Sequence, residues 1–121
     1  MANFAPISAL SLEDVNVLWA GKLAGNNIDP TGQTEGQAEL TPQMAFPVSS
    51  GNVSAPAEPS VWYTGSWLLG ATLGDGNMAQ VLVGPSGGVV TLTAGTTYDV
   101  WARLTGGTEV PVQFVGQLPV Y

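Results

Sequence analysis

The stretch LTAGTTYDVWARL, from Leu92 to Leu104, determines the fold of this chain. The chain turns at the Ala-Gly corner, and the side chains that follow then alternate between two faces. This pattern predicts a strand with one face in a core. A tyrosine that follows such a corner, six residues after a leucine, is typical of a tyrosine corner. In that device the phenol hydroxyl bonds to upstream backbone and fixes a crossover between two sheets. We therefore expect Leu92, Gly95 and Tyr98 to be structural. The inward row is Tyr98, Val100, Ala102 and Leu104, and the outward row is Asp99, Trp101 and Arg103.

The rest of the chain carries the same type of signal. Short apolar runs are separated by Gly, Pro, Asn and Ser clusters roughly every 8 to 12 residues, which is typical of a β-sandwich. Pro42 indicates an edge position or a bulge, and Pro111 and Pro119 indicate a sheet edge. Segment 47–60 is rich in Pro and Ser and predicts an exposed loop. We expect about seven strands, at residues 14–23, 37–46, 61–69, 77–83, 89–93, 98–104 and 109–121.

The length of 121 residues fits a single domain with a sizeable core. We assign residues 14–121 to that domain and residues 1–13 to an extended N-terminal arm. Pro6 disfavours an early helix, and the arm carries four sizeable apolar residues. A frayed terminus rarely has so many, so we expect a docked arm and treat fraying as the alternative. The four residues are Phe4, Ile7, Leu10 and Leu12.

Charge excludes several classes of partner. Only 9% of the residues are charged, and Lys22 and Arg103 stand against nine acids, for a net charge of −7. A protein that binds nucleic acid needs several Lys or Arg side chains on one face of its surface, so we expect no nucleic-acid partner. The same deficit argues against an anionic membrane. A surface so poor in charge favours a protein covered by neighbours or located outside cells, and a small protein with few charges for no such reason is the alternative.

Catalytic and metal-binding patterns are missing from the sequence. It contains no His and no Cys, which excludes Ser-His-Asp triads, Cys-His pairs and the usual zinc sites. A carboxylate pair such as Asp99 with Glu109 remains, but most acids fall beside turns, where solvated carboxylates are ordinary. Two oxygen-rich turns, at 26–29 and 75–77, lack the acidic density of a calcium loop. We expect neither an enzyme, nor a cofactor, nor a bound metal.

The aromatic residues are the stronger candidates for a binding surface. A carbohydrate-stacking platform or a patch for a partner protein could be formed by Trp62, Tyr63, Trp67 and Trp101, with Trp19, and core packing is the alternative. Trp101 belongs to the outward row of its strand, so it is the best single candidate for an exposed or interface tryptophan. Together with the arm, the candidate partner-binding residues are Phe4, Ile7, Leu10, Leu12, Trp62, Trp67 and Trp101.

About 100 of the 121 residues resemble small immunoglobulin-like (Ig-like) virion proteins of tailed phages of actinobacteria. Members combine a DPT and MAF strand pair, a Trp-containing strand, a VGP turn, an AG–Y–VW–R strand and a terminal EVPV strand. The arm and segment 47–60 depart from this pattern. The matching residues are Asp29–Pro30–Thr31, Met44–Ala45–Phe46, Trp62, Trp67, Val83–Gly84–Pro85, Gly95, Tyr98, Val100–Trp101, Arg103 and Glu109–Val110–Pro111–Val112.

The resemblance implies an Ig-like antiparallel β-sandwich and a non-enzymatic structural role in the virion. The expected function is a capsid decoration, or cement, protein made in the host cytoplasm and located on the capsid surface. Its expected partners are the major capsid protein and copies of itself in a homo-oligomer. A neck or tail protein, or a carbohydrate-binding module for host glycans, remains the alternative.

Overall fold

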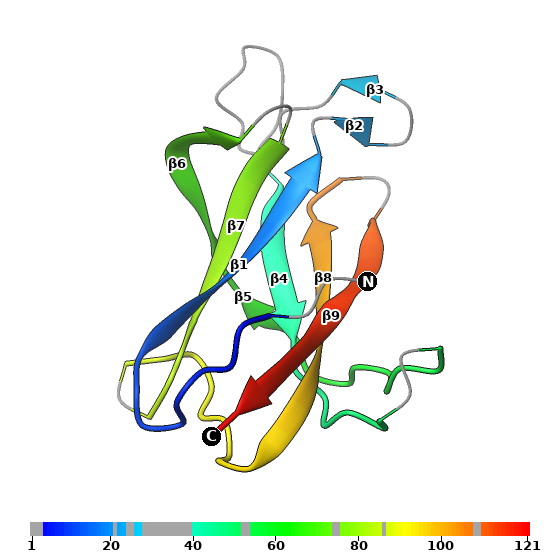
Figure 1. The fold of residues 1–121 in the computed structure, drawn as a ribbon. Helices are drawn as coiled ribbons and strands as arrows, with labels where there is room; N and C mark the ends of the chain where they lie inside the picture. The colour runs from blue at the N-terminus through cyan, green and yellow to red at the C-terminus, as the bar shows by residue number, and fades with distance from the viewer. Residues whose placement is uncertain are drawn as a thin grey trace.

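The chain folds as an all-β sandwich in a computed structural model (Figure 1). The structure describes residues 4–20, 22–23, 26–27, 40–51, 54–73, 76–85, 87–107 and 110–121. Within these ranges there is no helix, and two antiparallel sheets enclose one hydrophobic core. The predicted fold class is therefore confirmed.

The strand order is that of an Ig-like sandwich. The three-stranded sheet has the order β1 (Glu13–Ala20), β7 (Gly76–Val83), β6 (Ser66–Leu73). The four-stranded sheet has the order β5 (Tyr63–Thr64), β4 (Thr41–Ala45), β8 (Thr96–Thr105), β9 (Val112–Val120). A small hairpin joins β2 (Lys22–Leu23) and β3 (Asn26–Asn27). The two main sheets correspond to strands B-E-D and C′-C-F-G of Ig domains.

The tyrosine corner at the start of β8 is present as predicted. The amide of Thr93 donates a 2.8 Å hydrogen bond to the hydroxyl oxygen of Tyr98. Gly95 makes the corner with a φ of 77°, a region that an L side chain rarely adopts. Leu92 is buried just upstream of it. These contacts fix where β8 begins and therefore which of its side chains enter the core.

The inward row of β8 supplies the centre of the core, as the alternation predicted. Val100 and Leu104 are 0% exposed, and Ala102 is 1% exposed. Side chains of both sheets close around this row. The other core residues are Val15, Val17, Trp19, Met44, Phe46, Trp67, Ala79, Val81, Val83, Leu92, Tyr98, Leu118 and Val120.

The predicted strand at 89–93 is wrong. Among the described residues, two backbone hydrogen bonds join the segment after β7 to the end of β7. The Val89 amide donates to the Leu82 carbonyl, and the Gly84 amide donates to the Val90 carbonyl. It then crosses toward the other sheet without a partner strand. Gly84 has a φ of 144°, which turns the chain away from β7.

The predicted strand at 61–69 is divided between the two sheets. Residues 63–64 form β5 against β4, and residues from Ser66 onward form β6 against β7. Gly65 lies at the switch and donates a 2.8 Å hydrogen bond to the Pro42 carbonyl. A Cβ at Gly65 would clash with the Gln80 carbonyl oxygen and lie 2.8 Å from a methyl carbon of Val81. Only glycine permits this close approach of the chain to β7.

Pro42 lies within an interior strand, so the predicted edge or bulge is wrong there. It pairs with Leu104 of β8, and its carbonyl accepts the Gly65 amide on the opposite side. In an antiparallel ladder the amide and carbonyl of one residue point the same way. The missing amide of Pro42 therefore faces the two-residue strand β5, where the ladder is ending.

We predict that Tyr98→Phe lowers the free energy of unfolding by about 1–3 kcal/mol, because the Thr93 amide loses its acceptor. Urea denaturation measures the change. Tyr121→Phe is the matched control at a 68% exposed tyrosine, and it should change stability by less than about 0.5 kcal/mol. Equal effects of the two variants would contradict the structural role of Tyr98.

We also predict that Gly65→Ala destabilises the fold by more than about 2 kcal/mol, because the new Cβ overlaps β7 backbone. Ser66→Ala, at the exposed neighbouring position, should stay within about 0.5 kcal/mol of the parent protein. Thermal unfolding distinguishes the two variants. A stable Gly65→Ala protein would show that the chain does not change sheets at this residue.

Candidate interaction surfaces

The N-terminal arm docks along the free edge of β9. Ile7 forms a parallel bridge there: its amide donates to the Pro119 carbonyl at 3.1 Å, and its carbonyl accepts the Tyr121 amide at 2.9 Å. The Phe4 amide donates to the Gln117 carbonyl at 2.9 Å. The arm therefore lies along the end of β9 and bonds to its backbone, although it forms only one isolated bridge and no regular strand.

Docking divides the four apolar arm residues into two pairs. Phe4 and Ile7 are half-buried and pack against the core, so they are not displayed to a partner. Leu10 is 88% exposed and Leu12 is 49% exposed. Of the four candidates for partner binding in the arm, only these two lie largely on the surface.

Leu12 lies beside the segment that follows β7, where further apolar side chains are exposed, and Leu10 is two positions before it in the chain. In Figure 1 the start of β1 and the segment after β7 lie side by side at the lower left. The Cδ2 methyl carbon of Leu12 would lie 2.8 Å from a Cβ placed on Gly84, and its Cδ1 methyl carbon 3.9 Å from a Cβ placed on Gly87. Leu82, at the end of β7, and Val89, after the turn, are 36% and 46% exposed. We call this set, Leu10, Leu12, Leu82 and Val89, the leucine patch.

The predicted tryptophan platform is not assembled. Trp67 is 8% exposed and belongs to the core, where its Nε1 donates a 2.9 Å hydrogen bond to the Leu40 carbonyl. Trp19 is also in the core, at 5% exposure. The alternative of core packing is therefore correct for these two tryptophans.

The segment between β4 and β5 is irregular and most of its described residues are exposed, as predicted for 47–60, but part of it also covers the outer face of the four-stranded sheet. Its first residues continue the pairing with β8: the Asp99 amide donates to the Pro47 carbonyl at 2.8 Å, and the Ser49 amide donates to the Thr97 carbonyl at 2.9 Å. Residues 52–53 lie outside the described part of the chain.

Farther along, two side chains of β8 hold the same loop residue. Asp99 Oδ2 accepts the Ala57 amide, and Trp101 Nε1 donates to the Ala57 carbonyl, both at 2.9 Å. These two side chains supply the donor and acceptor that a neighbouring strand would supply. We call this arrangement the Ala57 clamp. It buries Asp99 to 1% exposure, and its Oδ1 has no hydrogen-bond partner among the described residues.

The clamp also decides the environment of Trp101, which is half-buried rather than freely exposed. Its ring lies 5.5 Å from that of Phe114, measured between centroids. Trp62 is half-buried as well, and the Arg103 guanidinium carbon lies 4.3 Å from its ring centroid. Arg103 Nε donates to Gln43 Oε1 at 2.7 Å, which holds the cation in place. Both tryptophans therefore have intramolecular partners.

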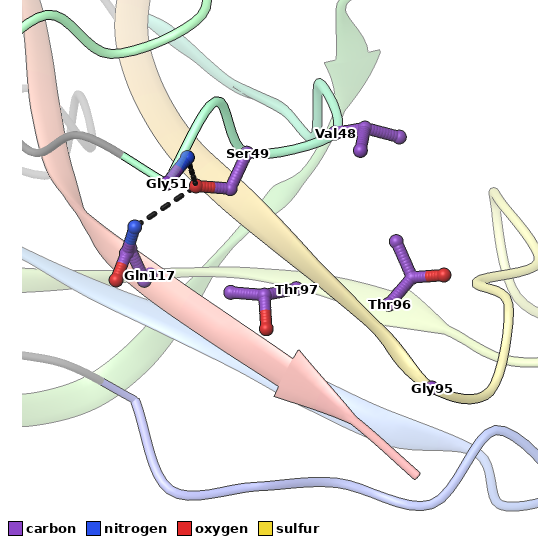
Figure 2. Close-up of a pocket in the computed structure, with 7 residues that line it drawn as sticks. All are labelled: Val48, Ser49, Gly51, Gly95, Thr96, Thr97 and Gln117. Carbon is purple, nitrogen blue, oxygen red and sulfur yellow. Dashed lines mark hydrogen bonds between the residues drawn. The ribbon is translucent and has the colours of Figure 1, made fainter.

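A shallow depression of about 420 Å³ lies beside the start of this segment (Figure 2). Ser49 Oγ accepts hydrogen bonds from Gln117 Nε2 at 2.9 Å and from the Gly51 amide at 3.0 Å. The depression contains no ionisable side chain, so it offers no acid–base chemistry. Its lining residues are Val48, Ser49, Gly51, Gly95, Thr96, Thr97 and Gln117.

No cluster of metal-binding side chains occurs among the described residues. Asp29 and Asp75 of the two oxygen-rich turns, and Glu109 of the considered carboxylate pair, lie outside the described ranges. The Asp29–Pro30–Thr31 motif of the resemblance lies outside them too.

Comparison with known proteins gives no relative: no family model, no curated protein and no solved structure matches the chain significantly. Across the described ranges, none of the elements is a helix able to cross a membrane. The fold and its surfaces define the chain as an Ig-like β-sandwich with an apolar patch at one end.

We predict that Asp99→Ala releases the loop and speeds hydrogen exchange of the Ala57 amide, because Ala57 loses half of its clamp. The free energy of unfolding should fall by about 1–3 kcal/mol. Asp99→Asn is the matched control, because its side-chain oxygen can still accept the Ala57 amide. Exchange of the Ala57 amide at the parent rate in Asp99→Ala would contradict the clamp.

Proposed function

We propose that this chain is a capsid decoration protein of a tailed phage, a non-enzymatic virion component that docks on the major capsid protein. The resemblance to Ig-like phage proteins gives the biological setting. The Ig-like sandwich is compatible with that setting, and the surface chemistry supports a role in binding. The protein would be made in the host cytoplasm and act on the outer surface of the capsid.

The observation that carries the proposal is the leucine patch. Four aliphatic side chains between 36% and 88% exposed lie on two chain segments that run side by side at one end of the domain, next to the docked arm. Burying apolar surface favours association, although the buried area does not translate directly into affinity. Many weak contacts on a repetitive shell gain strength through multivalency when the copies also contact each other.

Charge favours the same kind of partner. With a net charge of −7, the free protein repels other copies at long range and remains soluble. A shell with a basic or neutral outer surface would attract it, and the apolar patch would then make the close contact.

The competing functions differ in what they require. A neck or tail protein would use the same fold at one vertex, so copy number separates it from decoration. A glycan-binding module requires accessible tryptophan faces, but Trp67 is in the core and Trp62 and Trp101 are engaged by Arg103 and Ala57. No surface observation favours glycan binding.

We predict that the double variant Leu10→Asp, Leu12→Asp folds normally but no longer co-sediments with capsids that lack the protein. Both positions lie largely on the surface, so the charges abolish docking without disturbing the core. Val112→Asp is the matched control, at a 51% exposed apolar position on β9. Deletion of residues 1–12 is a poorer test, because it also removes the backbone hydrogen bonds between the arm and β9. Full binding by the double variant would contradict docking through the leucine patch.

Quantitative mass spectrometry of purified particles tests the function itself. Decoration predicts tens to hundreds of copies on each particle. A handful of copies confined to one vertex or to the tail would reject decoration in favour of the neck or tail role.

A further inference from the structure

We propose that β1 is a self-association site, at which two copies of the chain pair their β1 edges antiparallel and join their three-stranded sheets into one. This inference deepens the proposed function by naming a contact between copies, and it rests on that function only for the high local concentration of a shell. Its test uses the isolated protein, so its failure would leave docking on the capsid untouched.

Three of the four edges of the two main sheets are protected, over part or all of their length, against pairing with another chain. At β9 the arm covers the end from Gln117 to Tyr121, where Pro119 also interrupts the row of backbone amides. The edge at β5 is two residues long, next to Pro42. The edge at β6 has a register shift between Trp67 and Thr72. Coverage, shortness, prolines and bulges are the devices that proteins use to protect sheet edges.

Among the residues that the structure describes, none provides such a device at the edge of β1. Its pairing with β7 runs without a shift from Glu13 opposite Val83 to Ala20 opposite Gly76. The strand contains no Pro, Gly or Lys over its 8 residues. No described residue pairs with its outer side, because β1 ends the sheet. A straight, regular edge of this length presents a row of backbone donors and acceptors to another strand.

A second copy of β1 fits this edge in one orientation. The only charged residues of the strand, Glu13 and Asp14, occupy its first two positions. Parallel pairing would bring these acids together, whereas antiparallel pairing places each pair at the far end of its partner. Pairing about Val17 places Asp14 opposite Ala20 of the second copy, two positions before Lys22.

In that register the core-facing side chains of both copies lie on the same face of the joined sheet. Residues directly opposite in an antiparallel pair share a face, so pairing about Val17 places Val15 opposite Trp19 of the second copy. Val15, Val17 and Trp19 are core residues in each copy, and exposed Asn16 and Asp14 remain on the outer face. The contact has two-fold symmetry and closes as a dimer.

Sedimentation velocity over a range of protein concentrations tests the proposal with a matched pair of variants. Asn16→Lys places like charges on both edges near the two-fold axis and should weaken the dimer roughly tenfold. Gln80→Lys lies directly opposite Asn16, but one strand inside the sheet, and should have a much smaller effect. The parent dimer should strengthen with added salt, which screens repulsion between the acidic copies.

A monomer at all concentrations would overturn the proposal. So would a dimer that the two variants weaken equally, because its interface would then lie elsewhere.

A second measurement does not depend on weakening the dimer. The chain has no cysteine, so Asn16→Cys and Gln80→Cys each provide a single site for a nitroxide label. Adjacent strands lie about 4.8 Å apart, so moving the label from β1 to β7 in both copies should lengthen the spin–spin distance by about 10 Å. A shorter distance for the Gln80 label, or no dipolar coupling for either label, would contradict edge pairing.

Discussion

The hydrogen bond from the Thr93 amide to the Tyr98 hydroxyl sets the register on which the sandwich depends. It fixes the residue at which β8 begins, and β8 is buried on both sides over much of its length. One face supplies the centre of the core, and the other carries the two side chains that hold Ala57. A shift of one residue would exchange these faces, placing Asp99 and Trp101 in the core. The corner therefore positions the core and the loop together.

Much of this architecture could be predicted because it depends on local patterns. The alternation on β8 and the Leu-Gly-Tyr spacing predicted the core row and the corner correctly. The errors occurred where the path of the chain depends on distant neighbours. The division of 61–69 at Gly65 follows from the approach of β7, and Pro42 is tolerated inside the sheet because β5 ends beside it. Neither neighbour can be identified from the local sequence.

The surface was harder to predict than the core for a related reason. Outward alternation indicated that Trp101 would meet solvent or a partner, but a loop more than 40 positions away in the sequence bonds to its indole. The arm residues looked equivalent, yet Phe4 and Ile7 pack inward while Leu10 and Leu12 face out. The sequence offered one signal for the Ala57 clamp. Asp99 and Trp101 lie two positions apart on the outward face of their strand, and the chain also contains a long loop, at 47–60, that could cover them.

Amide hydrogen exchange of the unmodified protein, followed residue by residue by NMR, tests directly whether Tyr98 fixes the start of β8. We expect slow exchange for the Thr93 and Ala57 amides, although both lie outside the strands, because Tyr98 and Asp99 accept their hydrogen bonds. Exchange of the Thr93 amide at the rate of an unstructured peptide, while the amides of β8 remain protected, would contradict this role of Tyr98.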